Sequence, residues 1–336
     1  MAPVRMGFVG LGHITYHAHL PPFKKMADAG EVVFQAFCDK DADTASERAK
    51  EFGANAVYTD HHEMFEKEEL DGVYLCIPPT LHTDVELVAA EKGIAVFVEK
   101  PQTLDITQAV AFNKAISSAG ILSQVGFMSR YYPSSEFVKE KVEAGTARHA
   151  LVQLLYSGKH IRYWTSRVEL CGGSFVENTV HMVDLLRYFL GDIESVSAFY
   201  FERQPGEGPE PINLPHVYDV NYRFKSGVVA SATTSRVLTN VNCSRRDVSV
   251  ILDDALLEWS AQSVVENDEQ VFSAPEENNA FARQAQAFVA AIRTGDGSLL
   301  RSPYHDALNS LAAVLGANAS AANGGALVNL SEFTGA

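Results

Sequence analysis

The chain has 336 residues, of which 46% are hydrophobic and 21% charged, as in ordinary globular proteins. This length suggests two domains. The formal net charge of −15 argues against binding to nucleic acid or to an anionic membrane, because both need a basic surface. The apolar runs are too short for a membrane span or a signal peptide, and the four cysteines form no C-x-x-C pair. We therefore expect a cytoplasmic protein without disulfides.

The first 125 residues alternate between short apolar runs and amphipathic stretches. The runs predict strands buried on both faces of a parallel sheet, at residues 6–9, 32–38, 72–77, 94–98 and 121–125. The stretches between them predict helices at residues 41–52, 81–92 and 106–119. This alternation predicts an α/β fold with a Rossmann domain over residues 1–125, built on a mainly parallel sheet of six strands.

After Gly126 the pattern changes to alternating strands separated by turns. Candidate strands cover residues 147–156, 195–201, 218–224, 228–234, 247–252 and 255–259, and candidate helices cover residues 176–190, 281–293 and 304–322. The second domain, residues 126–336, is therefore predicted to be α+β with an open, mostly antiparallel sheet, and to bind substrate and form oligomers.

The segment Gly10-Leu11-Gly12 directly follows the first predicted strand. In the dinucleotide-binding fingerprint G-x-G-x-x-G, the first glycine makes the tight turn and the second lets a pyrophosphate approach the helix N-terminus. Thr15 replaces the third glycine. Because a G-x-G is often only a turn, its place after a strand is what favours a dinucleotide site here.

Asp39 ends the second apolar run, where a carboxylate would accept hydrogen bonds from the 2′-hydroxyl of the adenosine ribose. The alternative is that Asp39 starts a turn or caps the next helix. Lys40 follows, and its ammonium could neutralise a 2′-phosphate. The pair favours NAD as cofactor and leaves NADP possible.

Two further strands end in candidate ligand-binding residues. One ends at Ile77-Pro78-Pro79, with His82 close behind, although Thr80 could simply cap a helix there. The other ends at Glu99-Lys100, where a buried lysine could act as acid or base or, alternatively, lie at a surface turn.

A third candidate segment runs from Gly172 to Asp184. On a regular helix Glu177, His181 and Asp184 would form one narrow polar stripe on an otherwise apolar surface. The stripe is either part of an active site or a solvated face. Nearby, Arg162 and Trp164 could stack on and hydrogen-bond to a polyhydroxylated ring, or Trp164 could cover a domain junction.

Together these motifs resemble the glucose–fructose oxidoreductase/inositol dehydrogenase (Gfo/Idh/MocA) family. The resemblance is carried by Gly10-Leu11-Gly12-His13-Ile14, Ile77-Pro78-Pro79-Thr80-Leu81-His82, Glu99-Lys100-Pro101, Val125-Gly126-Phe127-Met128-Ser129-Arg130, the segment 172–184, and Arg301-Ser302-Pro303-Tyr304 with Asp306-Ala307.

The resemblance implies NAD(P)-dependent chemistry on pyranose- or inositol-type substrates, and a homodimer or homotetramer formed through the C-terminal sheet. Lys100 matches the family's catalytic lysine and His181 its catalytic histidine, while Glu177 stands where many members carry an aspartate. The resemblance also adds residues from the matching motifs to the predicted site. For the cofactor these are His13, Ile14, Glu99 and Arg130, and for the substrate Met128 and Asn178, the latter in place of a commoner apolar residue.

The expected reaction is hydride transfer between the nicotinamide and a carbinol carbon, with His181 as base, Glu177 orienting it, and Lys100 stabilising charge on the oxygen. The roles of Lys100 and His181 could be exchanged. A metal is not expected. Three alternatives stay open: a non-catalytic NAD(P)-binding regulator, an enzyme that uses transient oxidation to drive an elimination, and a reductase of non-sugar substrates such as dihydrodiols.

Overall fold

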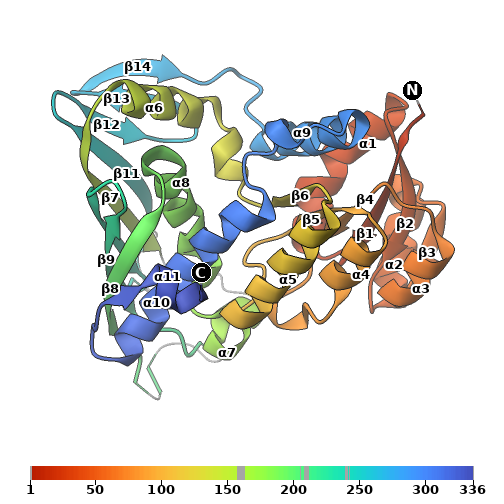
Figure 1. Cartoon of the computed structure of the whole chain (residues 1–336), viewed down its shortest axis with the longest axis horizontal. Coiled ribbons are helices and arrows are strands. Elements are labelled where there is room, and N and C mark those ends of the chain that lie inside the picture. Colours follow the sequence, from red (N-terminus) through yellow and green to blue (C-terminus); the bar gives the residue numbers. More distant parts are fainter. Residues whose placement is uncertain are drawn as a thin grey trace. The chain divides into compact units, whose positions relative to one another are not determined.

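The computed structural model describes residues 2–156, 163–204, 206–207, 212–238, 241 and 243–335, and it contains two β-sheets (Figure 1). By internal contacts the chain divides into two units whose segments alternate along the sequence. The first unit contains residues 1–103, 108–131 and 279–306, and the second contains residues 104–107, 132–278 and 307–336. This division differs from a single cut after residue 125, because residues 279–306 pack with the N-terminal part.

The first unit is built on a six-stranded sheet in which all strand pairs are parallel, as predicted. The strand order is β3 (Ala56–Tyr58), β2 (Val32–Cys38), β1 (Val4–Val9), β4 (Gly72–Leu75), β5 (Ala95–Val98), β6 (Ser123–Val125). The chain leaves β1 toward β2 on one side and returns to β4 on the other. The carboxyl end of β1 is therefore the topological switch point, where ligands bind in open α/β sheets.

Helices cover both faces of this sheet: η1 (Thr15–His19), α1 (Leu20–Asp28), α2 (Ala42–Phe52), α3 (His61–Lys67), η2 (Pro79–Leu81), α4 (Val85–Glu91), α5 (Ile106–Ala119), η3 (Met128–Tyr131), α9 (Ala280–Thr294) and η6 (Gly297–Leu299). Residues of α1, α2 and α9 share one buried cluster with the strands. At its centre the rings of Tyr74 and Phe97 stack with centroids 3.9 Å apart, and Phe288 of α9 meets Tyr74 edge-on. On the other face α3 and α4 pack side by side (Figure 1).

The segment that returns from the C-terminal part extends the edge of the first sheet. Val125 of β6 donates its N–H to the carbonyl of Ser302 at 2.8 Å, and its own carbonyl accepts from the Ser302 hydroxyl at 2.7 Å and from Gln284 at 3.1 Å. This contact gives a structural reason for the Arg301-Ser302-Pro303-Tyr304 motif.

The second unit contains a nine-stranded sheet. Its order is β14 (Glu269–Ser273), β13 (Ser263–Glu266), β12 (Leu256–Trp259), β11 (Ser244–Leu252), β7 (Ala147–Tyr156), β10 (Val229–Ser235), β9 (Val217–Phe224), β8 (Ile193–Phe201), β15 (Val328–Asn329). Among the described strands of this second sheet, only the β7–β10 pair is parallel, so the predicted open, mostly antiparallel sheet is confirmed.

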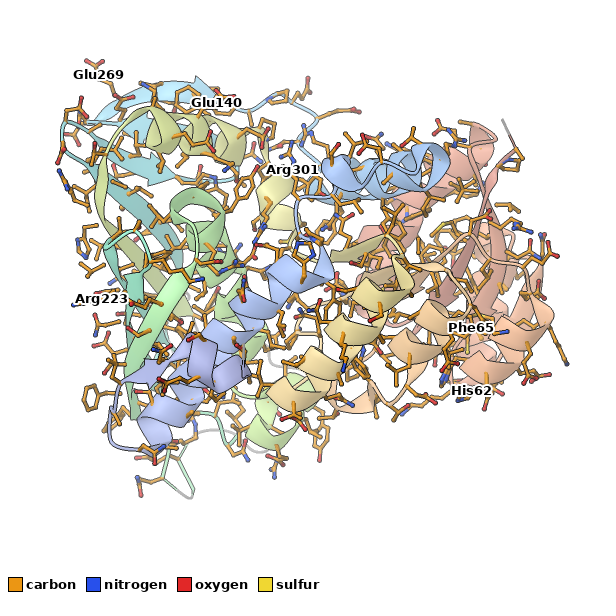
Figure 2. The ribbon with its side chains drawn as sticks, viewed as in Figure 1. His62, Phe65, Glu140, Arg223, Glu269 and Arg301 are labelled. Atoms are coloured by element: carbon orange, nitrogen blue, oxygen red, sulfur yellow. The ribbon has the colours of Figure 1, made fainter. Side chains whose placement is uncertain are left out.

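In the described part of the chain, helices lie on one face of this sheet, and strand side chains on the other face are exposed (Figure 1). The remaining helices are α6 (Pro133–Ala144), η4 (Trp164–Ser166), α7 (Val168–Cys171), η5 (Phe175–Thr179), α8 (Val180–Leu190), α10 (Tyr304–Ala322) and α11 (Leu330–Thr334). Alternate residues of β9 are buried and exposed, and Arg223 lies on the exposed side (Figure 2). Phe199 and Phe201 of β8 also point outward and are 61% and 66% exposed. Within the described part of the chain, no helix has the length and apolar character to cross a membrane.

Candidate functional site

The turn after β1 needs glycine at its first position. Gly10 has φ +85°, and a Cβ there would lie 2.4 Å from the carbonyl oxygen of Cys76. A Cβ on Gly12, in contrast, would have no heavy atom within 4 Å, so open space lies over the second glycine. Thr15 is completely buried, and its hydroxyl donates to the carbonyl of Gly10 at 2.7 Å. The turn is therefore held in place on the side of Thr15 and accessible to a ligand on the side of Gly12.

Asp39 is tied to this turn. Its Oδ2 accepts the backbone N–H of Leu11 at 2.7 Å, and its Oδ1 accepts that of Asp41 at 3.0 Å. Asp41, not Asp39, caps helix α2, so the alternative that Asp39 is the helix cap fails. The bond to Asp41, two residues further on, is an Asx turn, so the alternative that Asp39 starts a turn holds beside its proposed role toward the ribose. Asp39 is partly buried and Lys40 is exposed. His13 is exposed and Ile14 is partly buried at the start of the following helical segment.

The residues after β4 are held by a buried histidine. The Nδ1 of His82 lies 2.5 Å from Oε1 of Glu86, its Nε2 lies 3.2 Å from the carbonyl oxygen of Ile77, and both side chains are completely buried. This arrangement fixes the Ile77-Pro78-Pro79 segment. Helix α4 begins only at Val85, so Thr80 does not cap it. The sequence analysis did not single out Glu86, although its spacing four residues after His82 is a usable signal.

Glu99 organises the end of β5. One carboxylate oxygen lies 2.8 Å from Nε2 of the buried His19, and the other accepts the backbone N–H of Lys100 at 3.0 Å. A Cβ on Gly126 would lie 2.7 Å from Oε1 of Glu99, which explains the glycine after β6. Lys100 itself is partly buried rather than a fully exposed turn lysine. His19, which lies 80 residues from Glu99, was missed because nothing local connects the two.

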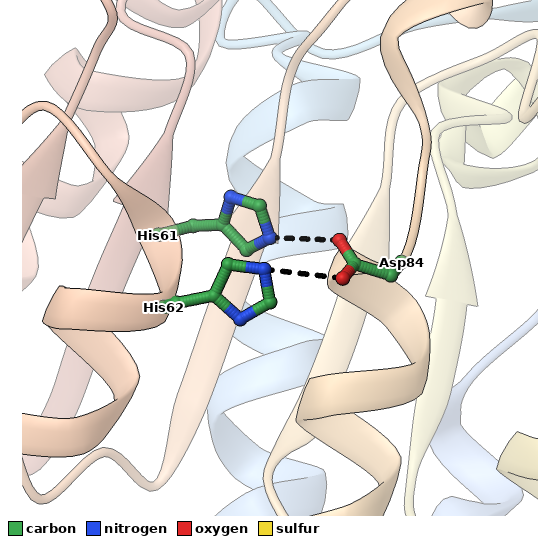
Figure 3. Close-up of side chains that lie close together, drawn as sticks. All are labelled: His61, His62 and Asp84. Carbon is green, nitrogen blue, oxygen red and sulfur yellow. Dashed lines mark hydrogen bonds and ion pairs between the residues drawn. The ribbon is translucent and has the colours of Figure 1, made fainter.

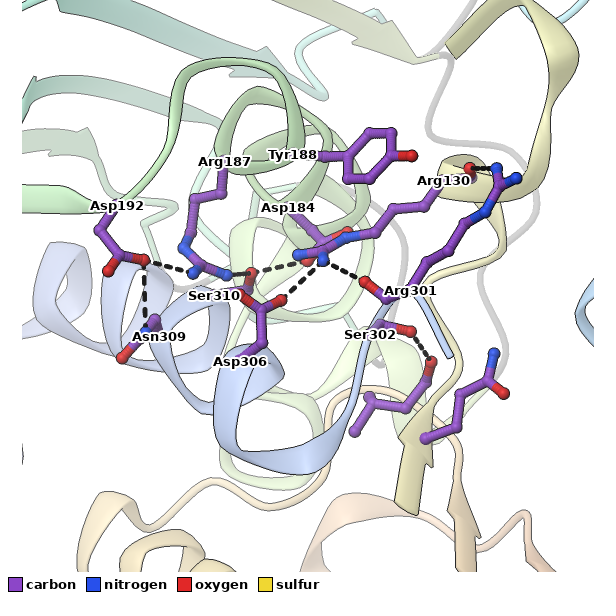
Figure 4. Close-up of polar contacts among 12 residues, drawn as sticks. Arg130, Asp184, Arg187, Tyr188, Asp192, Arg301, Ser302, Asp306, Asn309 and Ser310 are labelled. Atoms are coloured by element: carbon purple, nitrogen blue, oxygen red, sulfur yellow. Dashed lines mark hydrogen bonds and ion pairs between the residues drawn. The ribbon is translucent and has the colours of Figure 1, made fainter. Parts of the chain in front are cut away.

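Arg130, predicted to contact the cofactor, is buried in a polar network of the first unit (Figure 4). Its guanidinium lies 2.6 Å from Oδ2 of Asp306 and donates to the carbonyl of Arg301. Arg301 in turn donates to the carbonyl of Arg130 at 2.6 Å. Met128 lies two residues before Arg130 in η3 and is partly buried.

The cysteines are consistent with a site that uses no thiol. All four are free, and Cys38 and Cys76 lie at or just after the ends of β2 and β4, beside the glycine turn. Burial, with a smaller contribution from Asp39, raises the pKa of the Cys38 thiol to about 12. Burial also raises the pKa of Cys76 well above its usual value, so both thiols stay neutral near pH 7.

In the second unit, the residues of the predicted polar stripe differ in burial. Residues Phe175–Thr179 form a π-helical turn before α8, and such turns often occur at functional sites. Glu177 and His181 are partly exposed, but Asp184 is completely buried and accepts a hydrogen bond from Ser310 at 2.7 Å (Figure 4). Arg187 donates to the same hydroxyl at 2.8 Å. His181 and Asp184 keep their three-residue spacing within α8, but Asp184 is buried against α10, so it is not part of a solvated face.

Asn178 has a defined partner. The hydroxyl of Tyr156, at the end of β7, donates to Oδ1 of Asn178 at 2.8 Å, and the guanidinium of Arg236 lies 5.0 Å from the centre of the Tyr156 ring. Trp164 begins η4 and is partly buried. Arg162 lies outside the described residues.

The residues of the first unit fit a bound dinucleotide. The glycine turn lies at the switch point of the sheet, the space over Gly12 leaves room for a pyrophosphate beside backbone N–H groups, and a carboxylate stands at the end of β2. The fold and this site together define a protein with a nicotinamide dinucleotide-binding Rossmann unit joined to a mixed-sheet unit.

Family models give a more specific assignment. Residues 4–127 match the oxidoreductase family with an NAD-binding Rossmann fold, and residues 138–255 match the GFO/IDH/MocA C-terminal domain. The chain therefore belongs to the Gfo/Idh/MocA family of oxidoreductases, and NAD is its cofactor.

Curated relatives include inositol dehydrogenases. The chain is 29% identical over 195 residues to scyllo-inositol 2-dehydrogenase (NAD(+)) of Bacillus subtilis strain 168, an alignment that covers 58% of this chain and 56% of that protein. It is 29% identical over 238 residues to myo-inositol 2-dehydrogenase of Thermotoga maritima, which covers 69% of each chain. The chain thus aligns with little more than half of the first relative.

Solved structures share the fold over nearly the whole chain. An oxidoreductase from Thermotoga maritima superposes with a TM-score of 0.85 at 23% identity and covers 98% of this chain and 99% of its own. A levoglucosan dehydrogenase determined with NADH and L-sorbose gives a TM-score of 0.84 at 18% identity, with the same coverage. At these identities the comparison supports the fold alone.

Proposed function

We propose that this protein is an NAD-dependent dehydrogenase or reductase that acts on a carbinol or carbonyl carbon of a sugar, an inositol or a related polyol. The observation that carries the proposal is the glycine turn bound to Asp39, which builds a dinucleotide site in a chain whose relatives include inositol dehydrogenases. A cytoplasmic location, and the absence of nucleic-acid and membrane partners, stay predictions from the sequence.

In this proposal the first unit holds the cofactor. The turn at Gly10 and Gly12 would bind the pyrophosphate, and Asp39 the ribose, while the Ile77-Pro78-Pro79 segment and Glu99 would shape the remaining walls. The predicted cofactor set is completed by His13, Ile14, Lys40, His82, Lys100 and Arg130. His82 and Arg130 would act through the segments they hold in place. When bound, the nicotinamide would supply the hydride chemistry.

The proposed acid–base residues are Lys100 and His181. His181 would take the hydroxyl proton of the substrate as the carbon is oxidised, Glu177 would orient the imidazole, and Lys100 would stabilise negative charge on the same oxygen. Because the hydroxyl of Tyr156 occupies Oδ1 of Asn178, the amide nitrogen of Asn178 would be the group that donates to a substrate hydroxyl. Met128, Arg162 and Trp164 are the other proposed substrate residues.

A substrate panel tests the proposal. Reduced-cofactor absorbance should be followed with inositols, aldoses, uronates and keto-sugars, each with NAD and with NADP. Turnover of at least one polyol or sugar with release of reduced cofactor is the expected result. Turnover of dihydrodiols alone would favour the non-sugar reductase, and tight cofactor binding without turnover would favour a regulator. Product formation without net cofactor reduction would favour the elimination enzyme.

Cofactor preference should depend on Asp39. Asp39→Ala is expected to weaken NAD binding and to improve NADP binding relative to NAD, because a 2′-phosphate facing a carboxylate is repelled. Titration of both cofactors measures this ratio. Since Asp39 also holds Leu11 and Asp41, Asp39→Asn is the matched variant that keeps an acceptor but removes the charge. A wild-type protein that already prefers NADP strongly would show that Lys40 dominates.

The open face of the second sheet is the proposed oligomer interface. Phe201 and Val229 are exposed there at 66% and 48%, and apolar side chains of this kind are buried in homodimers. The double variant Phe201→Ser/Val229→Ser should lower the molar mass in light scattering after size exclusion. The control is Val57→Ser, which changes a residue of the first unit that is 40% exposed. A monomeric wild type, or an unchanged mass, would contradict this interface.

A further inference from the structure

A cluster of three potential metal ligands lies in the first unit, in residues with no place in the proposed dehydrogenase chemistry. His61 and His62 begin α3, and Asp84 directly precedes α4 (Figure 3). The Nε2 of His61 lies 3.0 Å from one carboxylate oxygen of Asp84, and the Nε2 of His62 lies 3.1 Å from the other. In the described part of the chain, this is the one group of three or more such side chains whose ligand atoms all lie within 4.8 Å of one another.

These distances are close to those in a metal centre. Zinc binds imidazole nitrogen and carboxylate oxygen at about 2.0–2.2 Å, so two ligands at a tetrahedral angle are about 3.4 Å apart. The two imidazole–carboxylate separations, 3.0 and 3.1 Å, are a few tenths of an ångström shorter, and all the ligand atoms lie within 4.8 Å of one another. Both histidines direct Nε2 toward the carboxylate, so one ion could replace both hydrogen bonds (Figure 3).

The surroundings of the cluster favour a cation. The carboxylate of Asp84 faces both imidazoles, one oxygen toward each Nε2. The hydroxyl of Thr83 donates to the Asp84 carboxylate at 3.0 Å and orients it, as outer-shell partners of metal ligands do. The adjacent Asp60 carboxylate caps α3 and adds negative charge nearby.

The cluster is also accessible. The side chains of His61, His62 and Asp84 are 22%, 51% and 40% exposed, so an ion can enter and keep water as a further ligand. Figure 2 shows His62 at the periphery of the first unit. Two imidazoles and one carboxylate suit zinc, nickel or cobalt, whereas magnesium and calcium prefer oxygen ligands alone.

We propose that His61, His62 and Asp84 form a binding site for one divalent transition-metal ion of the zinc class, with water completing the coordination. The ion would connect the beginnings of α3 and α4, which pack side by side, and would stabilise the folded chain by binding it in preference to the unfolded chain. Asp84 comes two residues after His82, so the same link would restrain the segment between β4 and α4.

The test uses the full chain, treated with chelator, exchanged into metal-free buffer and titrated with zinc chloride by calorimetry. One equivalent should bind with micromolar affinity or better, and zinc should raise the melting temperature by about 2–5 °C. Cobalt bound in its place should give the intense visible bands of a tetrahedral ion. None of these readouts requires enzymatic activity, so they stand independently of the proposed reaction.

Variants identify the ligands. His62→Gln and Asp84→Asn should each weaken zinc binding at least tenfold. In the metal-free state His62→Gln should unfold at nearly the same urea concentration as the wild type, because His62 is exposed. His17→Ala is the matched control, because His13 and His17 form another adjacent pair, with ring centroids 4.2 Å apart. The assignment would be overturned if the wild type bound no stoichiometric zinc, or if His62→Gln and Asp84→Asn bound zinc as tightly as the wild type. Loss of zinc binding in His17→Ala would also overturn it.

Discussion

Replacing Lys100 or His181 by alanine should lower kcat by about 10²–10⁴-fold while NAD binding is largely retained, because removal of a positioned acid or base typically has an effect of this size. The two residues come from different units, and neither contributes to the glycine turn or to the Asp39 contacts. Steady-state rates with the best substrate of the panel, measured beside titration of NAD, test both halves of this expectation.

Matched controls are Lys114→Ala and His305→Ala, which change exposed residues of α5 and α10 and should leave kcat within a factor of two of the wild type, or about 0.4 kcal/mol in barrier height. Glu177→Gln, which keeps the length of the side chain but removes its charge, should shift the pH dependence of kcat if Glu177 orients His181. Near-normal turnover in either alanine variant at Lys100 or His181 would remove that residue from the mechanism.

Gly10→Ala should destabilise the fold by about 2–5 kcal/mol. Two costs add up to this loss. An L-residue at positive φ costs about 1–2 kcal/mol, and forcing a methyl group into a packed site costs about 1–3 kcal/mol. The clash is with the backbone of Cys76, which a side-chain rotation cannot relieve. Urea unfolding followed by circular dichroism measures the change.

Gly12→Ala is the control for this prediction, since its added methyl group meets no atom of the chain. Its free energy of unfolding should equal or slightly exceed that of the wild type. The same methyl group would enter the space proposed for the pyrophosphate, so NAD binding should weaken about 10–100-fold, from a cost of about 1–3 kcal/mol. Unchanged NAD affinity in Gly12→Ala would contradict the proposed position of the cofactor.

The fold was most predictable where long elements carry a strong hydrophobic pattern. Strand β2 was predicted at residues 32–38 and helix α10 at residues 304–322, and both have these bounds. Strand β3 was missed because its three residues are partly or fully exposed, and α3 because seven mostly polar residues show no clear periodicity. The return of residues 279–306 to the first unit leaves no local signature, since it depends on packing between distant segments.

Some parts of the candidate site could likewise be predicted from the sequence, and others could not. The positions of Gly10 and Asp39 followed from their spacing after strands, and the hydrogen bond from Leu11 to Asp39 brings them together. The partners of Glu99 and Asp184 could not be predicted, because His19 is 80 residues from Glu99 and Ser310 is 126 residues from Asp184. The π-helical turn at Phe175–Thr179 likewise depends on tertiary contacts, since the sequence pattern alone fits a regular helix.

The return of residues 279–306 limits how this chain can be taken apart. A fragment ending at residue 125 would lack Phe288, which packs edge-on against the rings of Tyr74 and Phe97, and the backbone N–H of Val125 would lose its partner Ser302. Exposed apolar rings and open strand edges promote aggregation. The dinucleotide-binding unit is therefore not one continuous segment of sequence that can be moved alone. A chimaera that takes this unit from a relative must also take the segment that corresponds to residues 279–306.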